Sequence, residues 1–229
     1  MIMNRLTGLQ IALLEEFFRR EARFYLTGGA ALAGFYLGHR ETKDLDLFVT
    51  QDILEEGVEA LRAAAGALGA VLESLRTSPD FRRFVVRGTD EAVVVDLVRE
   101  RAEQIAPEKP LVGGIRLDPP PEILANKLCT LLSRAEIRDL VDVRALEAAG
   151  FTVEDALPAA RRKDGGLTPG QLAFVLSEIS IGDDASVPGG GSVPDLRSYL
   201  KGLVARLSRL ALPPRARVGD EAPRTVLHL

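Results

Sequence analysis

The sequence predicts an α+β fold, with strands and helices mixed in the N-terminal half and helices alone in the C-terminal half. Alternating, strand-like patterns occur only before residue 118, whereas helical periodicity dominates from there to residue 211. Between the two stand Asp118, three prolines and Glu122, which mark a helix start because proline fits the first helical turn. We therefore expect an α/β part at 1–118, a helical part at 119–212 and a mostly disordered, Pro- and Arg-rich tail at 213–229.

The elements of the N-terminal half follow from the spacing of its apolar residues. Residues 9–23 have the periodicity of an amphipathic helix, and 24–29 is a short strand that ends in Gly28 and Gly29. Further along, the polar segment GTDE separates two apolar runs, which is typical of a hairpin. The elements expected after residue 29 are a helix at 30–38, a strand at 43–49, a helix with its core at 52–70, strands at 81–88 and 92–98, and one more strand at 111–117.

The C-terminal half is expected to contain a series of separate helices. Ser133 and Glu136 match the S-x-x-E capping box, so the pattern predicts a break between two helices there rather than one long helix. A Gly- and Pro-rich loop is expected around residues 189–191. The expected helices are 121–132, 134–149, 152–162, 168–180 and 195–211.

Composition limits the classes of function that are open to this chain of 229 residues. Hydrophobic residues make up 46% and charged residues 27%, which provides for a buried core and excludes wholesale disorder. The net charge of −4 gives no chain-wide field that would attract nucleic acid. With no Trp and 5% aromatic residues, the composition also argues against a base-stacking platform of aromatic rings.

The cysteine and histidine counts narrow the options further. Cys129 is the only cysteine and His39 and His228 the only histidines, which excludes an intrachain disulfide framework and a Cys- or His-based metal site. No run approaches about 18 consecutive apolar residues, and the N-terminus lacks the apolar core of a signal peptide. We therefore expect a cytoplasmic protein with no membrane partner.

Three aspartates on predicted strands form the first candidate site. Asp44 and Asp46 are two residues apart and share one strand face, and Asp96 interrupts the apolar run VVVDLV. If the two strands are neighbours, the three carboxylates form an all-oxygen site suited to Mg²⁺. Gly28 and Gly29, where a strand ends and a helix begins, favour phosphate through bare backbone N–H groups. Taken singly, each feature has an ordinary alternative: a solvated strand edge, a turn, or a core acid that faces an arginine.

The order of these features resembles the nucleotidyltransferases of the DNA polymerase β superfamily. The matching segment reads LTGGAALAGFYLGHRETKDLDLFV, and it is more closely similar to the nucleotidyl transferase toxin family called AbiEii/AbiGii. A second matching motif is NKLCTLLSRAEIRDLVDV at residues 126–143, and DGGLTPGQLAFVL follows at 164–176. The resemblance covers roughly residues 9–180 and implies a polymerase β-like nucleotidyltransferase domain with a mixed sheet, followed by an all-helical C-terminal region.

One spacing departs from the family pattern. Fourteen residues lie between Gly29 and Asp44, slightly more than the resemblance implies. A one-residue insertion in the 30–38 helix, or near Gly34, would account for the difference. The insertion would affect how the Gly-Gly turn is aimed at the acids.

The resemblance also implies roles for individual residues. Two Mg²⁺ ions would be held by Asp44, Asp46 and Asp96, with a nucleoside triphosphate as substrate. Lys127 and Asp139 would act with these acids in catalysis, and Asp142 would have a supporting role. The nucleotide would be bound by Gly28, Gly29, Arg40, Lys127, Arg134 and Arg138.

The residues of the second motif also have ordinary interpretations. Arg134 and Arg138 are four apart on a predicted helix, so they share a face and either meet an anion or form a solvated ladder with aspartates. Lys127 can reach a phosphate or extend along the helix surface, and Arg40 can contact substrate or stabilise a helix end.

The function implied is transfer of a nucleoside monophosphate from a triphosphate to an acceptor hydroxyl, by the toxin of a toxin–antitoxin or phage-defence system. The acceptor would be RNA, tRNA in particular, and a cognate antitoxin would be the protein partner. A nucleotidyltransferase that modifies a small molecule and a catalytically idle interaction module remain as alternatives. The candidate RNA contacts are Arg82, Arg83, Arg87, Arg99, Arg101, Arg161, Arg162 and Lys163, with Arg215, Arg217 and Arg224 in the tail.

Overall fold

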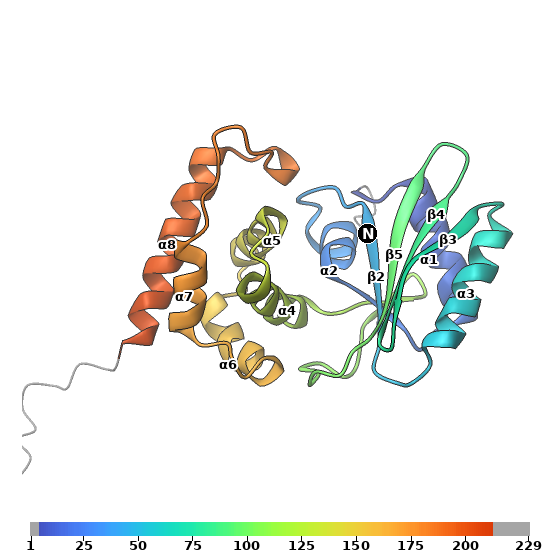
Figure 1. Ribbon diagram of the computed structural model, residues 1–229, viewed down its shortest axis with the longest axis horizontal. Coiled ribbons are helices and arrows are strands. Elements are labelled where there is room, and N and C mark those ends of the chain that lie inside the picture. The colour runs from blue at the N-terminus through green and yellow to red at the C-terminus, as the bar shows by residue number, and fades with distance from the viewer. Residues whose placement is uncertain (1–4, 213–229) are drawn as a thin grey trace, which may run out of the picture.

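The computed structural model describes residues 5–212, and the predicted disordered tail at 213–229 lies outside the described residues. A mixed sheet with its covering helices forms one half of the molecule, and a group of helices forms the other (Figure 1). The predicted α+β fold, with a mixed sheet followed by C-terminal helices, is confirmed. No helix within residues 5–212 is long and apolar enough to cross a membrane.

Among the described residues, the sheet has five strands in the order β1-β2-β5-β4-β3. Only β2 and β5 run parallel, and the remaining neighbours are antiparallel. The expected strand neighbourhood of the acids is therefore present. The bounds are β1 (Tyr25–Thr27), β2 (Asp44–Val49), β3 (Val71–Ser78), β4 (Phe81–Arg87) and β5 (Ala92–Arg99).

The two faces of the sheet have different environments. Leu45, Leu47 and Val49 of β2 are at most 1% exposed and point to the face that packs on α1 (Gly8–Arg20) and α3 (Leu54–Ala67). The alternate residues of β2 point to the opposite face, which looks toward the helical half in Figure 1. Alternation along β2 thus separates a packing face from a face that is free to carry chemistry.

The helix after β1 is not α-helical throughout. It begins as α2 (Gly28–Ala31) and continues as a π-helix, η2 (Leu32–Leu37), in which the Gly38 N–H donates to the Ala33 carbonyl at 3.1 Å. A π turn bonds residues five apart and so takes up one more residue than an α turn. A π turn at this position can take up the additional residue that the resemblance implies. Gly34 lies in this turn against Leu6, where a Cβ would come within 2.8 Å of the leucine side chain.

Strand β3 is absent from the sequence-based prediction, and α3 ends at Ala67 rather than near residue 70. The strand lies at the sheet edge and most of its side chains are exposed, so it lacks the alternation that reveals a half-buried strand. The expected strand at 111–117 is a small hairpin of β6 (Leu111–Val112) and β7 (Ile115–Arg116), because Gly113 and Gly114 turn the chain with positive φ.

Up to residue 212, where the described part of the chain ends, the helical half contains five α-helices: α4 (Pro120–Ser133), α5 (Ile137–Ala148), α6 (Val153–Lys163), α7 (Pro169–Ser177) and α8 (Val193–Ala211). The predicted break between α4 and α5 is present, but the predicted capping box is wrong. Ser133 belongs to α4 and its hydroxyl donates to the Thr130 carbonyl, while Glu136 is the residue that precedes α5. The break lies at Ala135, whose φ of +47° is incompatible with a continuous helix.

Candidate active site

Two adjoining cavities lie where the open face of the sheet meets the helical half. The larger, of about 750 Å³, is lined by residues of β2, β4, β5, α4 and the end of α6. It shares Asp46, Arg83, Asp96, Lys127 and Arg134 with the smaller cavity. The smaller one, of about 50 Å³, is lined by Gly29, Arg40, Asp44, Asp46, Arg83, Asp96, Lys127, Arg134 and Arg138. The predicted site residues therefore meet at one place, except that Gly28 lines only the larger cavity and Asp139 lines neither.

Asp46 is the central acid of this site. It lies opposite Asp96 in the parallel pairing of β2 with β5, and Asp44 is on the same face of its own strand. No hydrogen bond or ion pair to the Asp46 carboxylate is present within residues 5–212. Burial, together with the negative charges of Asp44 and Asp96, raises the pKa of Asp46 to about 7. A cation bound here would favour the ionised carboxylate.

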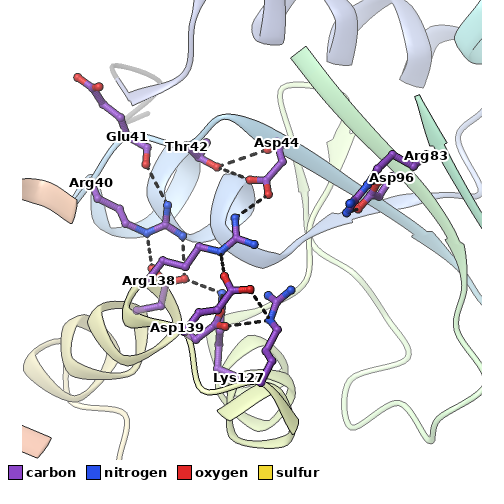
Figure 2. A network of polar contacts seen from close by, with 12 residues as sticks. Arg40, Glu41, Thr42, Asp44, Arg83, Asp96, Lys127, Arg138 and Asp139 are labelled. Carbon is purple, nitrogen blue, oxygen red and sulfur yellow. Dashed lines mark hydrogen bonds and ion pairs between the residues drawn. The ribbon is translucent and has the colours of Figure 1, made fainter. Parts of the chain in front are cut away.

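The other two acids are each paired with an arginine. Nη1 of Arg138 lies 3.0 Å from Oδ2 of Asp44, and the Arg83 guanidinium donates to both oxygens of Asp96 at 2.8 and 2.6 Å. In Figure 2, Arg138 reaches Asp44 from α5, whereas the Arg83 and Asp96 pair lies apart on the strands. Across residues 5–212, no three His, Cys, Asp or Glu side chains are arranged so that they could hold a metal ion. The arginines occupy the oxygen atoms that a metal ion would need.

The Gly-Gly turn approaches these side chains so closely that a side chain on Gly28 would be strained and one on Gly29 would displace Arg40. Gly28 has a φ of +63°, and a Cβ on it would lie 2.2 Å from Oδ2 of Asp46. A Cβ on Gly29 would lie 2.4 Å from Nη2 of Arg40. The backbone at the start of α2 therefore lies directly against Asp46 and Arg40.

A buried polar cluster supports this turn from behind. The Thr27 hydroxyl donates to Oδ2 of Asp118 at 2.5 Å, and the Asp118 N–H donates to the Leu26 carbonyl at 2.9 Å. Burial raises the pKa of Asp118 in spite of the Lys109 ammonium, 2.7 Å away. The strand that leads into the Gly-Gly turn is thus tied to the chain just before α4.

Lys127 of α4 connects the cavities to the helical half. Its side chain is 9% exposed, and Nζ lies 2.7 Å from both Oδ1 of Asp139 and Oδ2 of Asp142. Burial alone would lower the pKa of Lys127, but the charges of Asp142 and Asp139 raise it above its usual value. Lys127 is therefore a permanent cation at the wall shared by the two cavities.

Arg40 and Asp142 form a buried link between the two halves of the molecule. The guanidinium donates to both carboxylate oxygens of Asp142, at 2.6 and 2.9 Å, and Nε2 of His39 lies 2.8 Å from Oδ1. Burial would raise the pKa of Asp142, but Lys127, Arg40 and His39 hold it well below the usual range. Arg40 still lines the smaller cavity, and Asp142 has a more central place than its sequence position indicates.

The helix-face argument for Arg134 and Arg138 is wrong, although both residues reach the site. Arg134 follows the last residue of α4 and Arg138 lies in the first turn of α5, so the break at Ala135 separates them. Arg134 lies 3.3 Å from Asp139, which is fully buried behind Lys127. The position of Asp139 suits the orientation of Lys127 and Arg134 rather than direct contact with a ligand.

Arg83 lines both cavities, although the sequence predicts only an RNA contact for it. The signal lies in the cross-strand register, which places Arg83 of β4 opposite Asp96. The other basic candidates for RNA contact within residues 5–212 are largely paired with acids. These pairs are Arg82–Glu55, Arg87–Glu73, Arg99–Asp52, Arg101–Asp80, Arg162–Glu103 and Lys163–Glu122. Arg215, Arg217 and Arg224 lie outside the described residues.

The chain belongs to the nucleotidyl transferase AbiEii toxin family of type IV toxin–antitoxin systems, whose family model matches residues 12–196. The resemblance that the sequence motifs indicate is therefore confirmed. Among curated proteins, none matches the chain.

Two solved structures from Helicobacter pylori share the fold. JHP933 is 19% identical with a TM-score of 0.57, over 88% of this chain and 89% of its own. A chain described as a candidate nucleotidyltransferase is 18% identical with a TM-score of 0.55, over 88% of this chain and 92% of its own. The predicted nucleotidyltransferase-like α+β fold is consistent with both.

Proposed function

We propose that the protein is a Mg²⁺-dependent nucleotidyltransferase that moves a nucleoside monophosphate from a nucleoside triphosphate to an acceptor hydroxyl. The observation that carries the proposal is the position of Asp46. Its carboxylate has no protein partner within the described residues, lies between Asp44 and Asp96, and abuts the Gly28 backbone. A bound cation would stabilise the ionised form of a carboxylate in this setting.

The donor set would hold two divalent ions once Arg138 and Arg83 leave the carboxylates of Asp44 and Asp96. Carboxylate oxygens are the ligands that Mg²⁺ prefers, and Asp44, Asp46 and Asp96 would hold the ions. When bound, the ions would supply positive charge to the triphosphate and lower the pKa of the acceptor hydroxyl. Arg138 and Arg83 have side chains that are 39% and 44% exposed, so each can leave its aspartate without moving the backbone.

The cationic side chains suit a triphosphate. Five of them line the smaller cavity: Arg40, Arg83, Lys127, Arg134 and Arg138. Released from Asp44, Arg138 would turn toward the phosphates beside Lys127 and Arg134, and the backbone of Gly28 and Gly29 would contact the same groups. These cations would stabilise the charge that develops on the departing pyrophosphate.

The acceptor oxygen would attack the α-phosphorus in line, and Asp96 would take its proton. The new bond joins that oxygen to phosphorus as the bond to pyrophosphate breaks. Asp139 and Asp142 would keep Lys127 charged and oriented, at 2.7 Å on either side of its ammonium.

For the acceptor we propose RNA, tRNA in particular, in the cytoplasm, with a cognate antitoxin that opposes the reaction. A small-molecule acceptor is the second candidate. Several arginines that are candidates for RNA contact are paired with acids. Because these acids offset the positive charge, they weaken the attraction for RNA phosphates and favour a small-molecule acceptor.

The test is incubation of the protein with Mg²⁺, each of four α-labelled nucleoside triphosphates and total bacterial tRNA. Asp44→Ala/Asp46→Ala is the inactive control, and Asp52→Ala is a matched control because Asp52 is an exposed acid of the same half. Label in tRNA with wild type and Asp52→Ala alone supports the proposal. Triphosphate binding without labelled RNA transfers the assignment to a small-molecule acceptor. If the protein neither labels RNA nor binds a triphosphate, the remaining interpretation is an interaction module with this fold.

A further inference from the structure

The floor of the larger cavity is a row of apolar side chains beside the acids. Strand register places Tyr25, Phe48, Val98 and Phe81 side by side across β1, β2, β5 and β4. This row lies two residues along the strands from the row of Asp46 and Asp96, a separation of about 7 Å. Phe48, Val98 and Phe81 all line the cavity.

The two phenylalanine rings are held in place by their neighbours. The Phe48 ring centroid lies 6.3 Å from that of Tyr25, in a tilted arrangement. The guanidinium groups of Arg83 and Arg76 lie 5.4 and 5.7 Å from the Phe81 centroid. Both rings are half-buried and open to the cavity. The low aromatic content argues against an extended platform, but two rings suffice for a single base.

The wall that faces this floor is a polar stripe of α4. Asn126, Thr130 and Ser133 recur at helical spacing and all line the cavity. The hydroxyls of Thr130 and Ser133 donate to backbone carbonyls within the helix. The Asn126 side-chain amide makes no hydrogen bond within residues 5–212. An amide of this kind offers two donor hydrogens and a carbonyl acceptor to a ligand.

We propose that this part of the cavity is a nucleobase subsite. A base lies on Phe48, Val98 and Phe81 and presents its polar edge to Asn126, which determines the base preference. Asn126 directly precedes Lys127, so one helical turn carries both the residue that reads the base and the cation for the phosphates. This inference rests on the proposed function, because it assumes that the acids beside the floor act on the phosphates of the same nucleotide.

The base can belong to the nucleoside triphosphate or to the end of an RNA acceptor, and the test separates these sources. Binding would be measured by calorimetry with Mg²⁺ for four nucleoside triphosphates, inorganic tripolyphosphate and a short RNA with a free 3′ hydroxyl. The variants are Asn126→Leu, Phe81→Leu and, should Phe81→Leu not fold, Phe48→Leu. Phe174→Leu is the matched control because its ring is 68% exposed on α7, outside the cavity.

We expect wild type to prefer one triphosphate by about tenfold, as one bidentate contact to a base provides. Asn126→Leu removes that preference, and Phe81→Leu weakens all four triphosphates about fivefold or more through lost stacking. Tripolyphosphate binding is unchanged in these variants, and the Phe174→Leu protein binds all ligands as the wild type does. If only RNA binding responds to Asn126 and Phe81, the floor holds the acceptor base, and the subsite stands.

The subsite is overturned if neither triphosphate nor RNA binding responds to these variants while tripolyphosphate still binds. In that case the proposed transfer reaction survives, because the phosphate site is intact. Loss of all binding, tripolyphosphate included, in the wild-type protein contradicts the proposed function and the subsite together.

Discussion

Asp46 and Asp96 lie directly opposite each other on neighbouring parallel strands. Two carboxylates in this position repel. Asp96 is paired directly with Arg83, whereas the charge of Asp46 is offset only in part, by the more distant cations Lys127 and Arg138. The unfavourable energy falls on Asp46, because no residue in the described part of the chain forms an ion pair with it. The site is thus less stable without a bound cation, which has consequences that can be measured.

Asp46→Asn is expected to stabilise the protein when divalent ions are absent. The substitution removes a half-buried negative charge that lies beside those of Asp44 and Asp96, and a gain of about 1 kcal/mol would raise Tm by about 2–4 °C for a chain of this size. Thermal unfolding in EDTA at pH 8 measures the shift, with Asp52→Asn as the exposed control. Mg²⁺ with a triphosphate should raise the Tm of wild type but not of Asp46→Asn. An unchanged or lower Tm for Asp46→Asn in EDTA would contradict the assigned repulsion.

Lys127→Met is expected to destabilise the fold by about 3–5 kcal/mol, because it leaves Asp139 and Asp142 with an uncompensated buried charge. Adding Asp139→Asn should recover part of this loss, since one of the two charges is then gone. Urea unfolding of the single and double variants gives the coupling energy. Additive effects of the two substitutions would show that the ion pair has no energetic role.

The contact between α5 and α8 should weaken in acid. Glu147 accepts hydrogen bonds from Tyr199 at 2.7 Å and from Arg206 at 2.8 and 2.7 Å. Burial opposes the shift, but these bonds lower the pKa of Glu147 below its unfolded value. The stabilisation is therefore complete above that unfolded value, about 4.5, and is lost as pH falls.

Glu147→Gln tests this pH dependence. We expect a loss of about 1 kcal/mol at pH 7 and a smaller difference from wild type at pH 3.5. Unfolding curves at the two pH values provide the comparison. A difference that is independent of pH would mean that the charge of Glu147 contributes nothing.

Thr27→Val should reduce activity more than stability. The substitution keeps the side-chain volume but removes the hydroxyl that donates to Asp118, so the Gly-Gly turn loses its anchor. We expect KM for the triphosphate to rise several-fold with a small change in Tm, and Thr27→Ser to restore the wild-type KM. Steady-state kinetics of the transfer reaction decide this, and equal KM values for wild type and Thr27→Val would exclude a positioning role.

Much of the site could be predicted because its signals are local. Asp44 and Asp46 share a strand face by spacing alone, and Asp96 is conspicuous as a charge inside an apolar run. The pairing of β2 with β5, which brings these acids together, needed only the condition that the two strands are neighbours.

The remainder depends on contacts between distant segments. Arg83 belongs to the site only through the register of β4 on β5, and Asp142 acquires its role only when α5 meets Arg40. Strand β3 has no buried face to impose alternation, and the break at Ala135 depends on one backbone angle rather than on a capping side chain. Neither spacing nor composition encodes these features.

The π turn at Leu32–Leu37 has a consequence for comparing this chain with other members of its family. If other members have one residue fewer between Gly29 and Asp44, as the resemblance implies, the π turn would take up the extra residue and the segment from Gly38 to Asp44 would keep its length. An alignment that counts forward from Gly29 and opens its gap in that segment would assign His39 and Arg40 to the wrong columns. Counting back from Asp44 keeps Arg40 matched to the position that meets Asp142. Equivalent residues around the turn are therefore found by anchoring an alignment at both ends and placing the gap inside the helix.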